Sequence, residues 1–243
     1  MLIVDRSVDM IAPLIHDFGY EAISKDLLRI DTRKFKLNQD GRDKDVILDD
    51  EDEIWSKIRF GHLADAMEYM GKGVDKLAQE HSSVAMFETQ NADVGVSQLK
   101  DTLASLPTYQ VLKERFGIHT SICQQCFAIF SECLLEEVSH YEQDLCTQRT
   151  SKGKEPKNVF ERLCALLQNP KIRSDDKLRL MMLYIISKNG IDEKERAEIL
   201  RISGASIQDT QALTNLSLLG VRLSKSFGKD EQVWLVVSVK RDL

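Results

Sequence analysis

The sequence feature most suggestive of chemistry is a pair of cysteines three positions apart. Cys123 and Cys126 have the C-x-x-C spacing, and His119 lies one helical turn before them. Three such side chains could ligate zinc or take part in redox chemistry. A structural zinc site needs four ligands, however, and the sequence has no second pair of this kind. Cys126 also falls on the apolar face of a predicted helix, where a free cysteine packs as a small hydrophobic residue. We therefore predict no metal site and no cofactor.

Other motifs of catalytic or ligand sites are missing or have a simpler explanation. The acidic run 49–53 lacks the glycine and the terminal glutamate of a calcium loop, and negative charge at a helix N-terminus stabilises the helix dipole. The histidines have no catalytic spacing to a serine or an acid, and there is no P-loop or nucleophile elbow. Although residues distant in sequence can assemble an active site, we predict no enzyme and no small-molecule substrate.

The composition indicates a folded protein. With 243 residues, of which 42% are hydrophobic, the chain can bury one large core or two small ones. The net charge of −6 and the scattered basic residues disfavour nucleic-acid binding. The 5 irregularly spaced cysteines are typical of reduced thiols in a cytosolic protein. The longest apolar runs, 180–186 and 233–237, are far shorter than the roughly 20 residues of a membrane-spanning helix, so we expect contact with membranes only through a partner.

The first half of the sequence predicts one isolated strand, a β-ribbon and several helices. Residues 2–4 are apolar throughout, as in a buried strand of a parallel sheet, yet no neighbouring strand follows. Polar, weakly periodic residues at 81–95 indicate a loop. The ribbon is expected from strands at 34–37 and 45–48, and helices are expected at 20–28, 54–77 and 118–146.

The second half predicts a bundle of four short helices after a charged linker at 147–157. Short connections make consecutive helices antiparallel neighbours. Asn169-Pro170 and Asn189-Gly190 are typical helix stops. The pairs that predict capping boxes at helix N-termini are Asn158 with Glu161, Asp192 with Glu195, and Ser206 with Asp209.

A proline interrupts the longest apolar stripe. Pro107 has no N–H to donate to the carbonyl of Leu103, so a continuous helix here costs about 3 kcal/mol. Burying one large side chain against a partner contributes about 1.5 to 3 kcal/mol, so a hairpin bent at Pro107 and an extended helix could have similar free energies. The alternative is an ordinary helix-proline-helix corner with every apolar residue in the core. The stripe consists of Val96, Leu99, Leu103, Leu106, Tyr109, Leu112 and Phe116, three or four residues apart.

Several stretches, taken in order, resemble the Sec-one/Munc-eighteen (SM) family of vesicle-fusion proteins, which bind SNARE helices. "LIVDRSVDMIAPLIHDFGYEA" is similar to the family's segment of a strand followed by Asp-Arg-x-x-Asp-x-x-x-Pro-Leu-x-His. "VILDDEDEIW", "LPTYQ", "YEQDL" and "DKLRLMMLYIISKNGI" follow at the family's relative positions. The resemblance covers residues 1 to about 223, and the sequence is most similar to those of the exocytic, plasma-membrane members.

The resemblance implies a mainly α fold, namely the helical domain 3 of an SM protein with a small β-ribbon and an orphan N-terminal strand from a missing α/β domain. The family's first domain, which holds the pocket for the N-terminal peptide of syntaxin, is also expected to be missing, as in a fragment or a truncated gene model. The implied parts are the tail of the middle domain at 1–18, a long-helix and hairpin subdomain at 19–147, a short-helix bundle at 148–223 and a divergent tail at 224–243.

The resemblance also implies a function without catalysis. In the family, the equivalent hairpin bends or straightens, and the straight form offers a surface to SNARE helices. We expect the chain to bind syntaxin-type and vesicle SNARE helices and to template their assembly before exocytosis. It would act in the cytoplasm, attached through SNAREs to the plasma membrane or secretory vesicles. The alternative is a generic helical scaffold or regulatory domain unrelated to fusion.

The expected switch is the segment 96–122, with Pro107 as its hinge. Its apolar side chains would touch the partner helix or support the face that does so. The expected SNARE-helix residues are Leu106, Tyr109, Leu112, Lys113, Phe116, His119 and Thr120.

Overall fold

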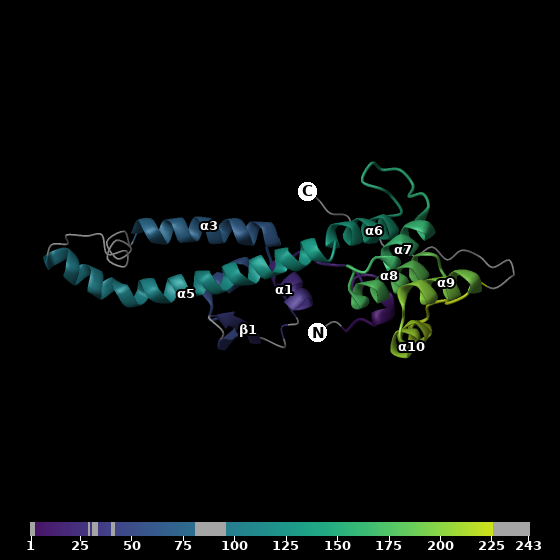
Figure 1. Ribbon diagram of the computed structural model, residues 1–243, viewed down its shortest axis with the longest axis horizontal. Coiled ribbons are helices and arrows are strands. Elements are labelled where there is room, and N and C mark those ends of the chain that lie inside the picture. Colours follow the sequence, from purple (N-terminus) through teal and green to yellow (C-terminus); the bar gives the residue numbers. More distant parts are fainter. Residues whose placement is uncertain (1–2, 29, 31–33, 40–41, 81–95, 226–243) are drawn as a thin grey trace. The chain divides into compact units, whose positions relative to one another are not determined.

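The computed structural model describes residues 3–28, 30, 34–39, 42–80 and 96–225 (Figure 1). The chain divides into two compact units, each described here by itself. The first unit lies within 15–141 and 170–173, and the second within 1–14, 142–169 and 174–243. The four sequence parts implied by the family resemblance stay a prediction.

Helix α1 and the β-ribbon of the first unit are confirmed. Helix α1 (Tyr20–Leu28) and the antiparallel strands β1 (Lys34–Gln39) and β2 (Arg42–Ile47) lie close to their predicted positions. Phe35 lies opposite Val46 in the ribbon, and both side chains are buried. Alternation along the two strands thus turns one apolar face inward while Lys34 and Lys36 stay exposed. The turn predicted between the strands includes residues outside the described part of the chain.

The single helix predicted at 54–77 is wrong, because the chain forms two helices with a turn between them. These are α2 (Glu53–Ile58) and α3 (Leu63–Glu80). The turn is fixed by distant backbone groups: the Gly61 carbonyl accepts the Tyr20 N–H at 2.8 Å, and the Leu63 N–H donates to the Phe18 carbonyl at 2.9 Å. These bonds satisfy backbone N–H groups at the first turns of α1 and α3. The spacing of apolar residues in the sequence carries no information about this stabilisation. His62 and Val74, predicted to face inward, are exposed.

The acidic run before α2 acts as predicted. Asp52 is the N-cap of α2, and its Oδ1 accepts the N–H groups of Ile54 and Trp55 at 2.9 and 3.0 Å. This satisfies two backbone donors at the helix start and places a negative charge at the positive end of the helix dipole. The loop predicted at 81–95 lies outside the described residues.

Helix α5 (Val96–Glu132) passes through Pro107 without a break, and it lies beside α3 (Figure 1). Helix α6 (Leu135–Thr147) follows after a turn in which Leu134 has a φ of 54°. The predicted helix 118–146 is therefore wrong in its bounds: the chain breaks after Glu132, with no proline there. Of the side chains predicted to face inward, Ile122, Cys126 and Val138 are fully buried, whereas Phe127 is exposed.

The second unit contains the predicted short helices. Two of the predicted capping boxes form: Asp209 Oδ2 accepts the Ser206 N–H at 2.8 Å, and Glu195 closes the box with Asp192. The box predicted at Asn158 does not form, because its φ of 52° is left-handed and an N-cap needs extended backbone. The helices are α7 (Val159–Gln168), α8 (Ser174–Ser187), α9 (Glu193–Ser203) and α10 (Ile207–Asn215), followed by the 3-10 turn η2 (Leu216–Leu219).

The predicted N-terminal strand is not formed in the described residues. Residues 3–5 have neither helix nor strand, and the side chains of Ile3 and Val4 are 80% and 57% exposed. A strand that is apolar on both faces cannot form without neighbours. Leu2 lies outside the described residues, and the chain continues into the 3-10 turn η1 (Arg6–Val8). The mainly α fold with a small ribbon is confirmed, and none of the described helices has the length and apolar character needed to cross a membrane.

Gly190 should be the less replaceable of two left-handed glycines. Its φ is 96°, and an added Cβ would lie 3.0 Å from the Ser224 carbonyl carbon, whereas Gly204 has a φ of 67° and open space around it. We expect Gly204→Ala to lower the free energy of unfolding by about 1 kcal/mol, and Gly190→Ala by about 2 to 3 kcal/mol. Urea denaturation of both variants measures the difference. Equal losses would contradict the contact with Ser224.

Candidate functional site

The stripe predicted to bind a partner is partly occupied by helix α3. Tyr109 is buried against Leu77 of α3, and Leu112 and Phe116 pack beside them, half-buried. The Phe116 ring also stacks on Tyr69 of α3, with ring centres 6.5 Å apart. In this conformation Tyr109, Leu112 and Phe116, the part of the stripe whose side chains the structure describes, hold the two helices together, and only their edges are accessible.

Gly73 makes the close packing of Phe116 possible. An added Cβ at Gly73 would lie 2.2 Å from Cε1 and 2.5 Å from Cζ of Phe116, much closer than any van der Waals contact. The same construction at Gly71 meets nothing within 4 Å. Glycine is unfavourable inside a helix, so its presence at position 73 is explained by the room that the Phe116 ring needs. Nothing in the amino-acid sequence indicates the pairing of Gly73 with Phe116.

His119 faces inward and ties α5 to two other helices. Its side chain is fully buried, its Nδ1 lies 2.8 Å from the Tyr20 hydroxyl, and its Nε2 lies 3.2 Å from Asp52 Oδ2. Nε2–H donates to the Asp52 carboxylate, and which partner donates in the hydrogen bond between Nδ1 and the Tyr20 hydroxyl depends on the protonation of the ring. The ring also stacks on Trp55, with centres 6.2 Å apart. His119 was predicted to contact a SNARE helix, but its side chain points into the protein interior and helps to hold α5 in place.

Asp52 combines this contact with its role as N-cap of α2. Burial alone would raise the pKa of its carboxyl group, but hydrogen bonds from His119 and from the Trp55 amide, together with electrostatic attraction to His119 and Arg115, lower the pKa to about 2. Arg115 Nη1 lies 3.9 Å from Asp52 Oδ1 and donates to the Glu51 carbonyl at 3.3 Å. The folded protein therefore stabilises the ionised carboxylate.

The remaining predicted residues define what is accessible on α5. Pro107 and Lys113 are exposed, and Lys113 Nζ lies 5.5 Å from the centre of the Tyr109 ring. Thr120 is half-buried. The side chain of Leu106 lies outside the described residues. The accessible edge, formed by Leu112, Lys113, Phe116 and Thr120, runs along one face of the helix with one cation beside apolar surface.

The cysteine pair is unsuited to reactive chemistry at neutral pH. Cys123 and Cys126 are fully buried, and burial raises the pKa of Cys123 to about 11 and that of Cys126 to about 12. The thiolate, which is the nucleophile and the metal ligand, is therefore strongly disfavoured. Within the part of the chain that the structure describes, no three side chains that could ligate a metal come together.

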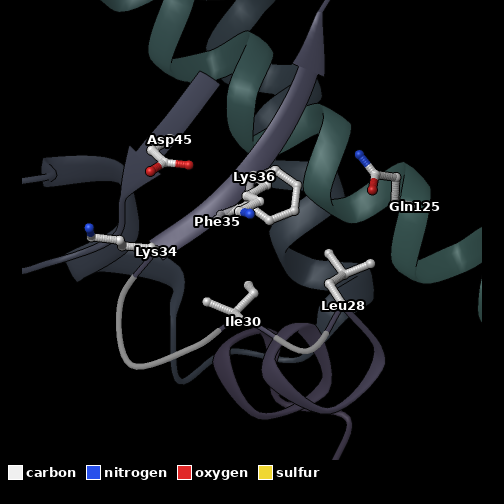
Figure 2. A pocket seen from close by; sticks show the side chains of 7 residues that line it. All are labelled: Leu28, Ile30, Lys34, Phe35, Lys36, Asp45 and Gln125. Carbon is white, nitrogen blue, oxygen red and sulfur yellow. The ribbon is translucent and has the colours of Figure 1, made fainter. Parts of the chain in front are cut away.

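A shallow pocket of about 290 Å³ lies between the end of α1, strand β1 and helix α5 (Figure 2). Its apolar wall consists of Leu28, Ile30 and Phe35. Figure 2 shows Lys34 and Asp45 on one side and Gln125 on the other, so the polar ends do not converge on one point. A pocket of this kind lacks the converging polar groups of a catalytic site.

The chain has clear relatives among protein-transport and SNARE-interacting proteins. A model of the Sec1 family matches residues 1–235. Protein transport protein sec1 of Dictyostelium discoideum is 34% identical over 230 residues, which cover 93% of this chain and 38% of that protein. The SNARE-interacting protein KEULE of Arabidopsis thaliana is 28% identical over 228 residues, covering 90% of this chain and 33% of KEULE. The chain thus spans about a third of the length of these curated relatives.

Solved structures share the fold. The Unc18 chain in the Unc18-syntaxin 1 complex from Monosiga brevicollis has a TM-score of 0.79 at 22% identity, covering 100% of this chain and 44% of that chain. The SM protein Vps45, in complex with the Qa SNARE Tlg2, has a TM-score of 0.74 at 17% identity, covering 93% of this chain and 41% of that one. These likenesses agree with the helical fold described above.

The packing of Phe116 against Gly73 predicts opposite effects at two neighbouring glycines. Gly73→Ala should lower the free energy of unfolding by about 1 to 3 kcal/mol because the ring must move. Gly71→Ala, two positions earlier on the same helix, should raise it by up to about 1 kcal/mol through helix propensity. Denaturant titration measures both. Phe116→Leu should reduce the penalty of Gly73→Ala in the double variant, and strictly additive effects would contradict the contact.

The lowered pKa of Asp52 predicts a stability change in acid. A carboxyl group with a pKa of about 2 when folded and 3.8 as its ordinary value stabilises the fold above pH 4, and this contribution is lost as the pH falls toward 2. Between pH 5 and pH 3 the wild type should lose about 1 kcal/mol more than Asp52→Asn, which keeps a capping side chain without the charge. Urea denaturation at each pH measures the loss. Glu53→Gln, the exposed neighbour, is the control and should follow the wild type.

Proposed function

The chain belongs to the Sec1 family, and from this premise we propose that it binds SNARE helices and templates their assembly before exocytic fusion. Among its relatives, KEULE is a SNARE-interacting protein, and two of the solved structures are complexes with syntaxin 1 and with the Qa SNARE Tlg2. The proposed partners of this chain are accordingly syntaxin-type and vesicle SNARE helices. Family membership supports this function over a helical scaffold unrelated to fusion.

The observation that carries the proposal is the unbroken course of α5 through Pro107. A proline inside a helix costs about 3 kcal/mol, and the packing of Tyr109, Leu112 and Phe116 on α3 offsets this cost. Opposing contributions of similar size allow a second, bent conformer at modest cost. A helix that adds apolar contacts to the straight form would shift the population toward it.

Each predicted residue has a role in the proposed interface. Leu112, Lys113, Phe116 and Thr120 supply the accessible edge along which an amphipathic helix would lie. Tyr109 and His119 hold α5 against α3 and against the core of the first unit. Pro107 is the proposed hinge, and Leu106 stays a predicted contact whose side chain lies outside the described residues. The exposed ammonium group of Lys113 would pair with an acidic residue of the partner.

We propose that the protein is not an enzyme and needs no cofactor. It acts by holding helices in register, and the SM relatives support this class of function. We further propose a cytoplasmic protein whose SNARE partners hold it at the plasma membrane or at secretory vesicles. The exocytic subclass of the proposal is supported by relatives of the Sec1 and Unc18 type.

Replacing the proline tests the switch. Pro107→Ala restores the backbone donor and should favour the straight helix, so the full chain should bind a vesicle SNARE helix about tenfold more tightly or assemble SNAREs faster. Titration calorimetry measures the affinity, and circular dichroism measures the helix content.

Ser131→Ala provides the matched control. It also improves helix propensity at an exposed position of α5, but it lies outside the 96–122 segment and should change the affinity little. Unchanged binding and unchanged helix content in Pro107→Ala would refute the switch. Equal gains in both variants would show that general helix stability, and not the hinge, controls binding.

A further inference from the structure

The loop between α6 and α7 carries a concentration of positive charge that the proposed SNARE interface does not use. Figure 1 shows this segment, 148–158, standing out from the two helices that it joins. Its cations are Arg149, Lys152, Lys154 and Lys157, all exposed, with Glu155 as the one acid among them. The chain as a whole has a net charge of −6, so this loop opposes the overall charge.

The loop lies where the charged linker was predicted, and it has backbone hydrogen bonds of its own. The Thr150 N–H donates to the Lys154 carbonyl at 2.7 Å, and the Gly153 N–H donates to the Thr150 carbonyl at 2.8 Å. At its base, Arg162 of α7 donates to Asp144 of α6 at 2.6 Å. These bonds hold the backbone in one conformation, so a partner that binds the cations does not have to order the chain first.

None of the four cations forms an ion pair with another described residue, which distinguishes them from many basic side chains of the molecule. Arg162, Arg59 and Arg201 are paired with Asp144, Asp50 and Glu198, respectively. Like charges close in sequence repel one another, and an external anionic surface would relieve that repulsion. The loop thus has the electrostatics of a binding site for several negative charges at once.

The shape and composition of the loop favour a lipid surface over a protein. Apart from Pro156, the segment has no aliphatic or aromatic side chain, so it offers no apolar anchor of the kind that dominates protein interfaces. A protruding loop with four cations and one acid suits an anionic bilayer, where each Lys or Arg near the surface adds to the attraction. The contact needs neither a pocket nor insertion into the hydrocarbon.

We propose that the 148–158 loop binds the headgroups of anionic phospholipid bilayers. With all four cations near the bilayer, the expected association constant is on the order of 10³ M⁻¹ in accessible lipid. Binding of this strength is weak and reversible. Such binding would supplement attachment through a SNARE partner by raising the effective concentration at the membrane. It is independent of the proposed α5 interface, and it goes beyond the expectation that contact with membranes runs only through a partner.

Cosedimentation of the full chain with vesicles tests the proposal. The chain should bind vesicles with about 30% phosphatidylserine and not neutral phosphatidylcholine vesicles, and binding should fall steeply between about 0.1 and 0.5 M salt. Lys152→Gln with Lys154→Gln should weaken binding about 25-fold, at about fivefold for each cation. Circular dichroism confirms that the variant is folded.

A matched control separates the loop from net charge. Lys57→Gln with Lys194→Gln removes two exposed lysines elsewhere and should leave vesicle binding close to that of the wild type. Equal losses in both double variants, or equal binding to neutral vesicles, would overturn the proposal. Binding of poly-glutamate or inositol hexakisphosphate as tightly as an equal charge of anionic lipid would assign the loop to an acidic protein or a soluble phosphate. SNARE-helix affinity should stay unchanged in the loop variant, so failure here leaves the α5 interface untouched.

Discussion

The buried chain of hydrogen bonds from Tyr20 through His119 to Asp52 fixes the position of helix α5. A helix turns by a fixed angle per residue, so pinning one side chain inward sets the direction of all the others. With His119 inward, Phe116, Leu112 and Tyr109 follow at intervals of three and four residues and meet α3. The same contact places Asp52 at the start of α2. The orientation of the proposed interface therefore depends on a polar contact in the core.

Two locally unfavourable residues are explained by this arrangement. Pro107 removes a backbone hydrogen bond from α5, and Gly73 weakens α3. The gains that offset them come from contacts between the helices: Phe116 occupies the space above Gly73, and Tyr109 packs on Leu77. Because intrinsic helix stability and interhelical packing are in opposition here, a partner helix that alters the packing can shift the balance. This is the physical basis of the proposed switch.

The two proposed surfaces work by different forces. The edge of α5 offers apolar area next to one cation, so its affinity depends on shape and on burial. The 148–158 loop offers charge without apolar area, so its affinity depends on ionic strength and on the surface density of anions. A helix-forming partner suits the first surface and a bilayer suits the second. Each surface is built on hydrogen bonds that hold its backbone in place before the partner arrives.

The helical class, the β-ribbon, the capping boxes at Asp192 and Ser206 and the family resemblance were all predictable from the sequence. These features depend on local chemistry, since apolar periodicity and capping side chains act within a few residues of the chain. Three other features became visible only in the folded chain: the helix predicted at 54–77 breaks before Leu63, α5 ends at Glu132, and His119 faces inward. The break before Leu63 is made by backbone bonds to residues near Tyr20, and His119 is held by groups 99 and 67 positions away. Interactions over such separations leave no periodic trace in a single sequence, because each partner looks locally like an ordinary helical residue.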